Sequence, residues 1–384
     1  MAKSISYVLA CCMICTAMLF SGCDKKETGS DPTPPPGPTP PDPPTPTEDT
    51  TLYACDELCT PNPSPEALKL YTFLRKTYGR KVLSGTMANV NWNINEAEWV
   101  KYHTGKYPAM TCFDMIQSTL TDDWAQKQYA SFAVYEDWWA NNGLIMGMWH
   151  HVVPKTQATT TTTSNSTYKP NETSFKPANA LVAGTWENKI YMQDLDRVAE
   201  LLQGFRDRHI PIIWRPYHEA AGQWFWWGKG GDAATEVLLW QFMWNYFVNT
   251  KGLNNLIWVW TTQGSDFAWY PGDKYVDIVG RDIYNKEAPS FYNYFGYDQM
   301  IYPNKMLTLS EFGNGGTIED QWNAGAKWAY FMPWYDSKRT KSASPNSYWF
   351  TDTTTPHEHA TIQWWNNAWS QPYVLSRDQM PSLK

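Results

Sequence analysis

Short apolar runs recur through this chain, and segments with apolar residues at helical spacing separate them. Runs of this length, bounded by polar residues, predict strands that are buried on both faces. Strands that alternate with helices are typical of βα units around a parallel sheet. The chain has eight such runs: 82–87, 109–114, 144–150, 211–219, 256–261, 277–284, 306–311 and 326–332.

Eight βα units predict an α/β fold, the (β/α)8 or TIM barrel, as a single catalytic domain spanning 52–384. A helix is expected at 65–78, before the first strand, because Ser64 supplies an N-cap and Pro65 suits a first turn. Apolar residues at helical spacing predict further helices between the strands, at 125–142, 187–208 and 233–249.

The carboxyl ends of the strands form the active-site mouth of such a barrel. Polar and aromatic residues end the runs here, among them Asp114, His150, Glu219, Thr262, Asp282, Tyr284, Glu311 and Trp334. The segment 152–186, rich in Thr, Ser and Asn, follows the third run. We expect it to form a long loop along the rim of the mouth, with disorder as the alternative.

The fourth run carries the strongest chemical signal, because an apolar stretch ends in Arg215, His218, Glu219 and four aromatic residues. Strand periodicity would place Ile213, Arg215, Tyr217 and Glu219 on one face. A carboxylate followed by aromatic residues indicates a sugar-cleaving site. In the alternative interpretation, Arg215 and Glu219 form a buried ion pair and the tryptophans belong to the core.

Two glutamates, Glu219 and Glu311, end the fourth and seventh runs, which face each other across a barrel. Retaining glycosidases need two carboxyl groups about 5–5.5 Å apart, one as nucleophile and one as acid and then base. Strand ends hold such a separation rigidly. The charge of Glu311 would disfavour ionisation of Glu219, which would then keep the proton that a departing oxygen needs.

The motifs around these glutamates resemble glycoside hydrolase family 26, whose best-known members are endo-β-1,4-mannanases. Arg-Pro-Tyr-His-Glu at 215–219, followed by Gly-Gln-Trp-Phe-Trp-Trp-Gly at 222–228, is similar to the acid/base segment of that family. Ser-Glu-Phe-Gly at 310–313 is similar to its nucleophile segment. The resemblance covers about 68 to 334. Where members commonly carry Asn just after the acid/base, this chain has Ala220 and Ala221, a departure that affects the binding expected on the leaving side.

The resemblance implies that Glu219 is the acid/base and Glu311 the nucleophile. It also implies sugar-binding roles for His150, His218, Trp224, Tyr284 and Trp334. For His218, a neutral orienting role beside the acid/base is the alternative. Arg215 is expected to hold a carboxylate in place, or else to form an ion pair of the barrel interior. By position alone, Asp114 and Asp282 are further candidates, whereas Trp226 and Trp227 are assigned to the core.

The expected activity is that of a retaining endo-β-1,4-mannanase acting on mannan, glucomannan or galactomannan, without a cofactor. No metal site is expected, because the pairs His150-His151 and His357-Glu-His359 lack zinc-ligand spacing. The alternatives within the family are mixed-linkage β-glucan and β-1,3-xylan hydrolases. A glycan-binding surface lipoprotein without catalysis is the alternative from another class.

The N-terminus predicts export and lipidation. Lys3, an apolar stretch and small residues before Cys23 resemble a bacterial lipoprotein signal at 1–22, although Phe20 stands where Leu is usual. Cys23 would be lipidated, and the Pro- and Thr-rich segment at 23–51 would be an extended linker. These features predict a monomer anchored to a Gram-negative cell envelope through lipid alone.

Composition limits the kinds of binding partner that this chain is expected to have. A formal net charge of −7 provides no basic field for a phosphate backbone, so nucleic acid is not an expected partner. The chain has 23 Trp, 23 Tyr and 15 Phe, which suit sugar rings but belong mostly to the core. Cys55 and Cys59 are close enough to form a disulfide in an oxidising compartment, and Cys112 is expected to be a buried thiol.

Overall fold

The computed structural model describes residues 53–88, 92–337 and 348–384. The signal expected at 1–22, Cys23 and the linker expected at 23–51 lie outside these residues. Within the described ranges, no helix is long and apolar enough to cross a membrane.

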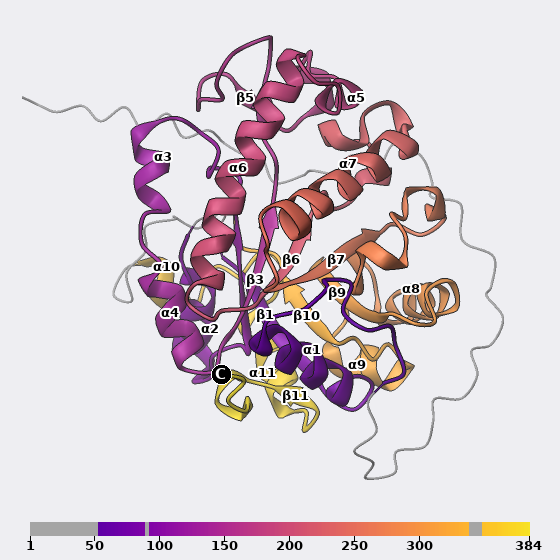
Figure 1. The fold of residues 1–384 in the computed structure, drawn as a ribbon. Helices are drawn as coiled ribbons and strands as arrows, with labels where there is room; N and C mark the ends of the chain where they lie inside the picture. The colour runs from indigo at the N-terminus through magenta and orange to yellow at the C-terminus, as the bar shows by residue number, and fades with distance from the viewer. Residues whose placement is uncertain (1–52, 89–91, 338–347) are drawn as a thin grey trace, which may run out of the picture. The chain divides into compact units, whose positions relative to one another are not determined.

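Eight parallel strands close into a barrel, in the order β10-β9-β8-β7-β6-β3-β2-β1, with β10 pairing again with β1 (Figure 1). All eight predicted strands are confirmed, and this architecture is the (β/α)8 barrel expected from the sequence. The strands are β1 (Val82–Met87), β2 (Met110–Asp114), β3 (Leu144–Trp149), β6 (Ile212–Pro216), β7 (Leu256–Thr262), β8 (Ile278–Tyr284), β9 (Met306–Gly313) and β10 (Tyr330–Pro333). A short strand, β11 (Val374–Leu375), adds to β1.

Helices surround the strands in Figure 1. They are α1 (Pro65–Thr77), α2 (Asn95–Thr104), α3 (Asp123–Gln128), α4 (Ala133–Ala140), α5 (Pro177–Ala180), α6 (Trp186–Arg206), α7 (Ala233–Asn245), α8 (Ala288–Ile301), α9 (Ile318–Ala324), α10 (Tyr348–Thr351) and α11 (Ile362–Ser370). The predicted cap of α1 is confirmed, because Ser64 Oγ accepts from the backbone N–H of Ala67 at 3.1 Å. Thr185 caps α6 in the same way.

The helix expected at 125–142 is instead two helices, α3 and α4. Ser131 lies in the break between them. Its side chain accepts from the backbone N–H of Ala133 at 3.3 Å, and its carbonyl accepts from Trp92 Nε1 at 2.7 Å. These local bonds replace helical ones, because serine competes for backbone groups.

The long loop expected after β3 has structure of its own. It contains a hairpin of β4 (Val153–Pro154) and β5 (Ser166–Thr167), and α5 of this segment packs against α6 and α7. Buried threonines hold it together; Thr173, for example, donates to the carbonyl of Pro154 at 2.6 Å. The alternative of a disordered segment is therefore wrong.

The connection from β7 to β8 differs from the others, because no α-helix follows β7. Two short 3₁₀ helices, η5 (Phe267–Trp269) and η6 (Asp273–Tyr275), stand in its place. The outer wall between α7 and α8 is therefore covered by an aromatic loop rather than by a helix.

The three cysteines of the described residues are free thiols. Cys55 and Cys59 do not form the disulfide that their spacing allows, and Cys55 Sγ lies 3.5 Å from the Tyr71 hydroxyl. The expectation for Cys112 is confirmed, since it is fully buried on β2.

Candidate active site

The fourth barrel strand, β6, ends at Pro216, and the chain then turns sharply. Tyr217 and Glu219 have positive φ angles of 43° and 53°, a region that residues with side chains rarely adopt. The alternation expected for 211–219 is therefore wrong beyond Pro216. Arg215 lies inside the barrel, whereas Tyr217 is buried among aromatic rings behind the sheet. The turn, rather than the strand, sets the position of Glu219.

Two glycines allow the turns after Glu219 to pack closely. A Cβ atom on Gly222 would lie 2.1 Å from the Trp224 ring, and one on Gly228 would lie 2.0 Å from the backbone oxygen of Ala220. With glycine at both places, Trp224 folds back toward the turn. Its indole Nε1 donates to Glu219 Oε2 at 2.9 Å. The motif thus fixes the carboxylate and its aromatic neighbour together.

The next two tryptophans hold the backbone around this segment in place. Trp226 and Trp227 are buried, as expected. The indole of Trp226 donates to the carbonyl of His151 at 2.6 Å, and that of Trp227 to the carbonyl of His218 at 3.0 Å. They thus hold the backbone next to His150 and at His218 from buried positions.

A β-bulge precedes the second glutamate. Strands β8 and β9 pair in register up to Arg281 and Leu309, after which Asp282 pairs with Glu311. The extra residue is Ser310, whose hydroxyl donates to Asp282 Oδ1 at 2.7 Å. Bulges re-aim side chains and are common beside active sites. Here the bulge immediately precedes Glu311.

Both oxygens of Glu311 are held by donors from other strands. Arg215 Nη1 donates to Oε1 at 2.6 Å, and the Tyr284 hydroxyl donates to Oε2 at 2.9 Å. Glu311 is only 5% exposed. Charge-assisted bonds of this length are among the strongest in proteins, so the carboxylate has a fixed orientation.

Arg215 joins three strands in the barrel interior. Its Nε donates to Thr261 Oγ1 on β7 at 2.8 Å, and its two terminal nitrogens contact Glu311 and Asp282. Burial alone would lower the pKa of Arg215, but Asp282 and Glu311 raise it above its ordinary value, so it remains a cation. Both interpretations of Arg215 hold, since the interior ion pair is also the group that orients Glu311.

Tyr284 stays a hydrogen-bond donor because its surroundings oppose ionisation. Burial raises the pKa of Tyr284 well above its ordinary value, and the charges of Glu311, Asp282 and Glu219 raise it further. Glu219 and Glu311 therefore act on the same hydroxyl. Tyr284 is therefore influenced by the charges of both glutamates.

The predicted histidines and Trp334 line the same mouth. His218 Nε2 lies 3.9 Å from Glu311 Oε1, and its ring lies 4.3 Å from that of His150. The Trp334 ring is 5.9 Å from His150. His150 Nδ1 lies 2.5 Å from Asp114 Oδ2, and the backbone N–H of His150 donates to Asp114 Oδ1 at 3.0 Å. Asp114, a candidate by position only, therefore orients a histidine of the mouth.

Two aromatic neighbours of this mouth were missing from the prediction. Phe225 packs against His218 and His150, with ring centroids 4.8 and 5.4 Å apart. Tyr168 reaches His150 from the loop after β3, with ring centroids 5.9 Å apart. This contact brings the loop to the rim, as expected. The aromatic run at 224–227 signalled Phe225, but no local pattern distinguished Tyr168.

The sequence suggests no role for His359 in the site, and the structure places it beside Tyr284. Their ring centroids are 5.7 Å apart and nearly perpendicular. A Cβ atom on Gly313 would lie 2.2 Å from His359 Nδ1, which explains the glycine after Glu311 and Phe312. The backbone N–H of Asn314 donates to the His359 carbonyl at 3.0 Å. The local sequence gives no signal for this contact, because His359 lies 46 positions after Gly313.

All eight predicted site residues therefore converge at the carboxyl ends of the strands. The two carboxylates differ in their surroundings: a cation and a phenol hold Glu311, whereas a neutral indole contacts Glu219. Glu311 is held rigidly beside a cation, whereas Glu219 lies against an aromatic ring. Two carboxylates in different surroundings are what a displacement reaction on a sugar requires.

Comparisons with known proteins agree with this geometry. Residues 59–353 match the sequence family described as glycosyl hydrolase family 26. Mannan endo-1,4-beta-mannosidase B of Piromyces sp is 32% identical over 295 residues, which cover 75% of this chain and 50% of that protein. The corresponding mannosidase of Thermothelomyces thermophilus is 32% identical over 285 residues, covering 73% and 57%. This chain thus spans about half the length of the curated relatives it matches.

Solved structures give the same result. The GH26 domain of an endo-beta-mannanase/endo-beta-glucanase from Prevotella bryantii has a TM-score of 0.75 and 36% identity, covering 84% of this chain and 98% of that one. A beta-mannanase from a symbiotic protist of the termite Reticulitermes speratus, complexed with gluco-manno-oligosaccharide, has a TM-score of 0.72 and 30% identity, covering 86% and 100%. The chain belongs to glycosyl hydrolase family 26.

Proposed function

We propose that this protein is a retaining endo-β-1,4-mannanase that cleaves internal bonds of mannan, glucomannan or galactomannan. The supporting observation is the fixed carboxylate of Glu311, with Arg215 on one oxygen and Tyr284 on the other, at a mouth that also contains Glu219. The names of the relatives in this family supply the substrate class.

In the first step, Glu311 attacks the anomeric carbon, and Glu219 gives its proton to the departing glycosidic oxygen. The sugar–oxygen bond breaks as an ester to Glu311 forms. In the second step, Glu219 takes a proton from water, which displaces Glu311 from the sugar. Two inversions give net retention, and neither step requires a cofactor.

The surrounding groups act on these two carboxylates. Arg215 and Tyr284 hold Glu311 in one orientation, so that little reorganisation is needed during attack. The indole of Trp224 holds Glu219, and its ring offers an apolar face to the leaving-side sugar. On the other side, His150, His218 and Trp334 surround the position of the reacting sugar.

Exchange of each glutamate for glutamine tests the mechanism. We expect Glu311→Gln to abolish release of reducing ends from glucomannan. Glu219→Gln should lose activity on natural substrates but retain the first step on an aryl mannoside, whose leaving group needs no proton. Glu236→Gln is the control, because Glu236 is buried on α7, outside the site, and burial raises its pKa so that its neutral form is favoured.

The configuration of the first product decides between retention and inversion. Proton NMR during early hydrolysis should detect the β-anomer before mutarotation. An initial α-anomer, or normal turnover by Glu311→Gln, would exclude this mechanism. Assays on a panel of mannans, mixed-linkage β-glucan and β-1,3-xylan separate the substrates within the family, and binding without turnover would indicate a non-catalytic glycan-binding protein.

We also propose that the mature chain is a monomer anchored to a Gram-negative envelope through lipid on Cys23, followed by the linker at 23–51. Labelling with palmitate should depend on Cys23 and be lost in Cys23→Ala. Size-exclusion chromatography of a chain lacking the lipid tests the monomer, and protease treatment of intact cells tests which side of the outer membrane it occupies.

A further inference from the structure

A pocket of about 350 Å³ opens on the outer wall of the barrel, where the helix after β7 is missing. Residues of the β7–β8 connection form one side, and residues 301–305, at the end of α8 and just after it, form the other. Lys305 immediately precedes β9, and Tyr275 lies just before β8. Because residues before parallel strands lie at the amino-terminal end of a barrel, this wall extends away from the mouth that contains Glu219 and Glu311.

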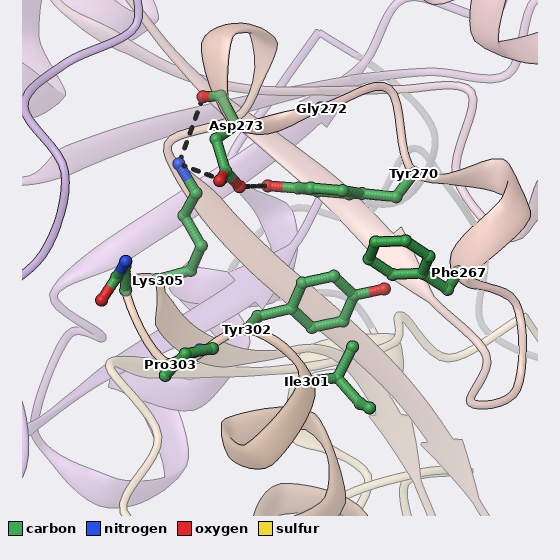
Figure 2. A pocket seen from close by; sticks show the side chains of 9 residues that line it. Phe267, Tyr270, Gly272, Asp273, Ile301, Tyr302, Pro303 and Lys305 are labelled. Atoms are coloured by element: carbon green, nitrogen blue, oxygen red, sulfur yellow. Dashed lines mark hydrogen bonds and ion pairs between the residues drawn. The ribbon is translucent and has the colours of Figure 1, made fainter.

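Three aromatic rings gather on one side of this pocket, as Figure 2 shows. The rings of Tyr270 and Tyr302 are 4.9 Å apart, and Phe267 is 6.1 Å from Tyr270 and 6.3 Å from Tyr302. Tyr302 is buried, whereas Phe267 is 64% exposed. A supported aromatic face that remains open to solvent is typical of a binding site.

Polar groups occupy the other side of the pocket in Figure 2. Lys305, whose side chain is 1% exposed, donates to the carbonyl of Val276 at 2.8 Å and forms an ion pair with Asp56 at 2.8 Å. Its Nζ also lies 3.9 Å from a carboxylate oxygen of Asp273. The same carboxylate accepts from the Tyr270 hydroxyl at 2.7 Å.

These contacts describe the chemistry of a ligand. The buried ammonium of Lys305 is compensated by Asp56 and Asp273, so the pocket has no net attraction for an anion. The Asp273 side chain is 69% exposed and can accept further hydrogen bonds. An open aromatic face beside an exposed carboxylate fits a neutral ligand with apolar faces and hydroxyl groups around its edge.

We propose that this pocket is a second glycan-binding site, which holds a β-1,4-linked mannan or glucomannan chain while another stretch of polymer lies in the mouth. The proposal rests on the proposed function for the identity of the polymer. A long chain reaches both sites and gains avidity from the second contact, whereas a short oligosaccharide fills only the mouth.

Affinity electrophoresis in native gels containing glucomannan tests this site. The parent for binding is Glu311→Gln, which prevents cleavage during the run. Addition of Phe267→Ala should weaken retardation about fivefold, the effect of one lost aromatic contact. Asn304→Ala, at a second exposed position of the pocket, should weaken it less. Tyr102→Ala is the control, because Tyr102 is 51% exposed on α2. None of these three substitutions changes the charge.

Hydrolysis by the chain with Glu311 intact separates the two proposals. Phe267→Ala should raise KM severalfold for polymeric glucomannan and leave kcat/KM for mannohexaose unchanged. Equal retardation of Phe267→Ala and its parent, together with normal cleavage of mannohexaose, would overturn the second site alone. Retardation that depends on Phe267 without any cleavage of mannohexaose would support the site and refute the proposed function.

Discussion

Tyr284→Phe isolates one of the two bonds that fix Glu311. The substitution removes a hydroxyl and keeps the ring, which is half-buried beside His359. The lost bond, 2.9 Å from hydroxyl to Oε2, is made to a carboxylate. Arg215 still contacts the other oxygen, so the nucleophile keeps its cation. The variant therefore tests how the hydroxyl orients and stabilises the Glu311 carboxylate, while the aromatic ring and Arg215 stay in place.

The size of the effect follows from the bond that is removed. A hydrogen bond to a charged group contributes about 1.5–3 kcal/mol, and about 1.36 kcal/mol of activation free energy corresponds to a tenfold change in rate. Because Arg215 remains, we expect the lower end of this range. The Tyr284 hydroxyl holds Glu311 in one orientation, so its loss should lower kcat/KM about tenfold.

The assay is kcat/KM on mannohexaose, measured at the pH optimum of the parent. Tyr246→Phe is the matched control, because the Tyr246 hydroxyl also donates to a carboxylate, Asp196 at 2.6 Å, but joins the segment just after α7 to α6, outside the barrel. Its kcat/KM should match that of the parent. An unchanged kcat/KM in Tyr284→Phe, or an equal loss in Tyr246→Phe, would refute the assigned role of Tyr284.

Three further predictions use other contacts of the structure. Arg215→Met should lower the free energy of unfolding, measured by urea denaturation, by about 3–5 kcal/mol, because it leaves two buried carboxylates without their cation. Adding Asp282→Asn to the same chain should restore part of this lost stability. Purely additive effects of the two substitutions would contradict the coupling between them. Trp224→Phe removes the donor that holds Glu219, so kcat/KM on mannohexaose should fall about tenfold, and an unchanged kcat/KM would contradict a role for this contact. Burial raises the pKa of Asp277 to about 6, above its unfolded value, so its contribution to stability is present below about pH 4 and is lost as pH rises to about 6. Urea midpoints between these pH values should fall more in the parent than in Asp277→Asn, and parallel slopes would refute this.

The strands were predictable because parallel barrel strands are buried on both faces. Each is therefore a continuous apolar run, and all eight were found. Their bounds were less certain. The last run was expected to begin at Ala326, but β10 begins at Tyr330, although Trp328 and Ala329 are also buried. Burial alone does not distinguish a strand from a buried connection.

Residues of the site that lie within motifs were predictable, but the geometry between motifs was not. The sequence placed Arg215 and Glu311 at strand ends, and their bond follows from barrel topology. The bulge at Ser310 depends on pairing with β8, which the local sequence does not encode. Tyr168 and His359 reach the mouth from distant loops, and only tertiary packing brings them there.

Arg215 links the stability of the barrel to its chemistry. One cation lies between two buried carboxylates, Glu311 and Asp282, and such clusters are often less stable than a well-packed apolar core. The cluster nonetheless joins β6, β7, β8 and β9 through Arg215, Thr261, Asp282 and Glu311. A displacement of any of these strands would change the orientation of Glu311. The barrel therefore retains buried charge where an apolar core would serve stability better, because that charge holds the proposed nucleophile.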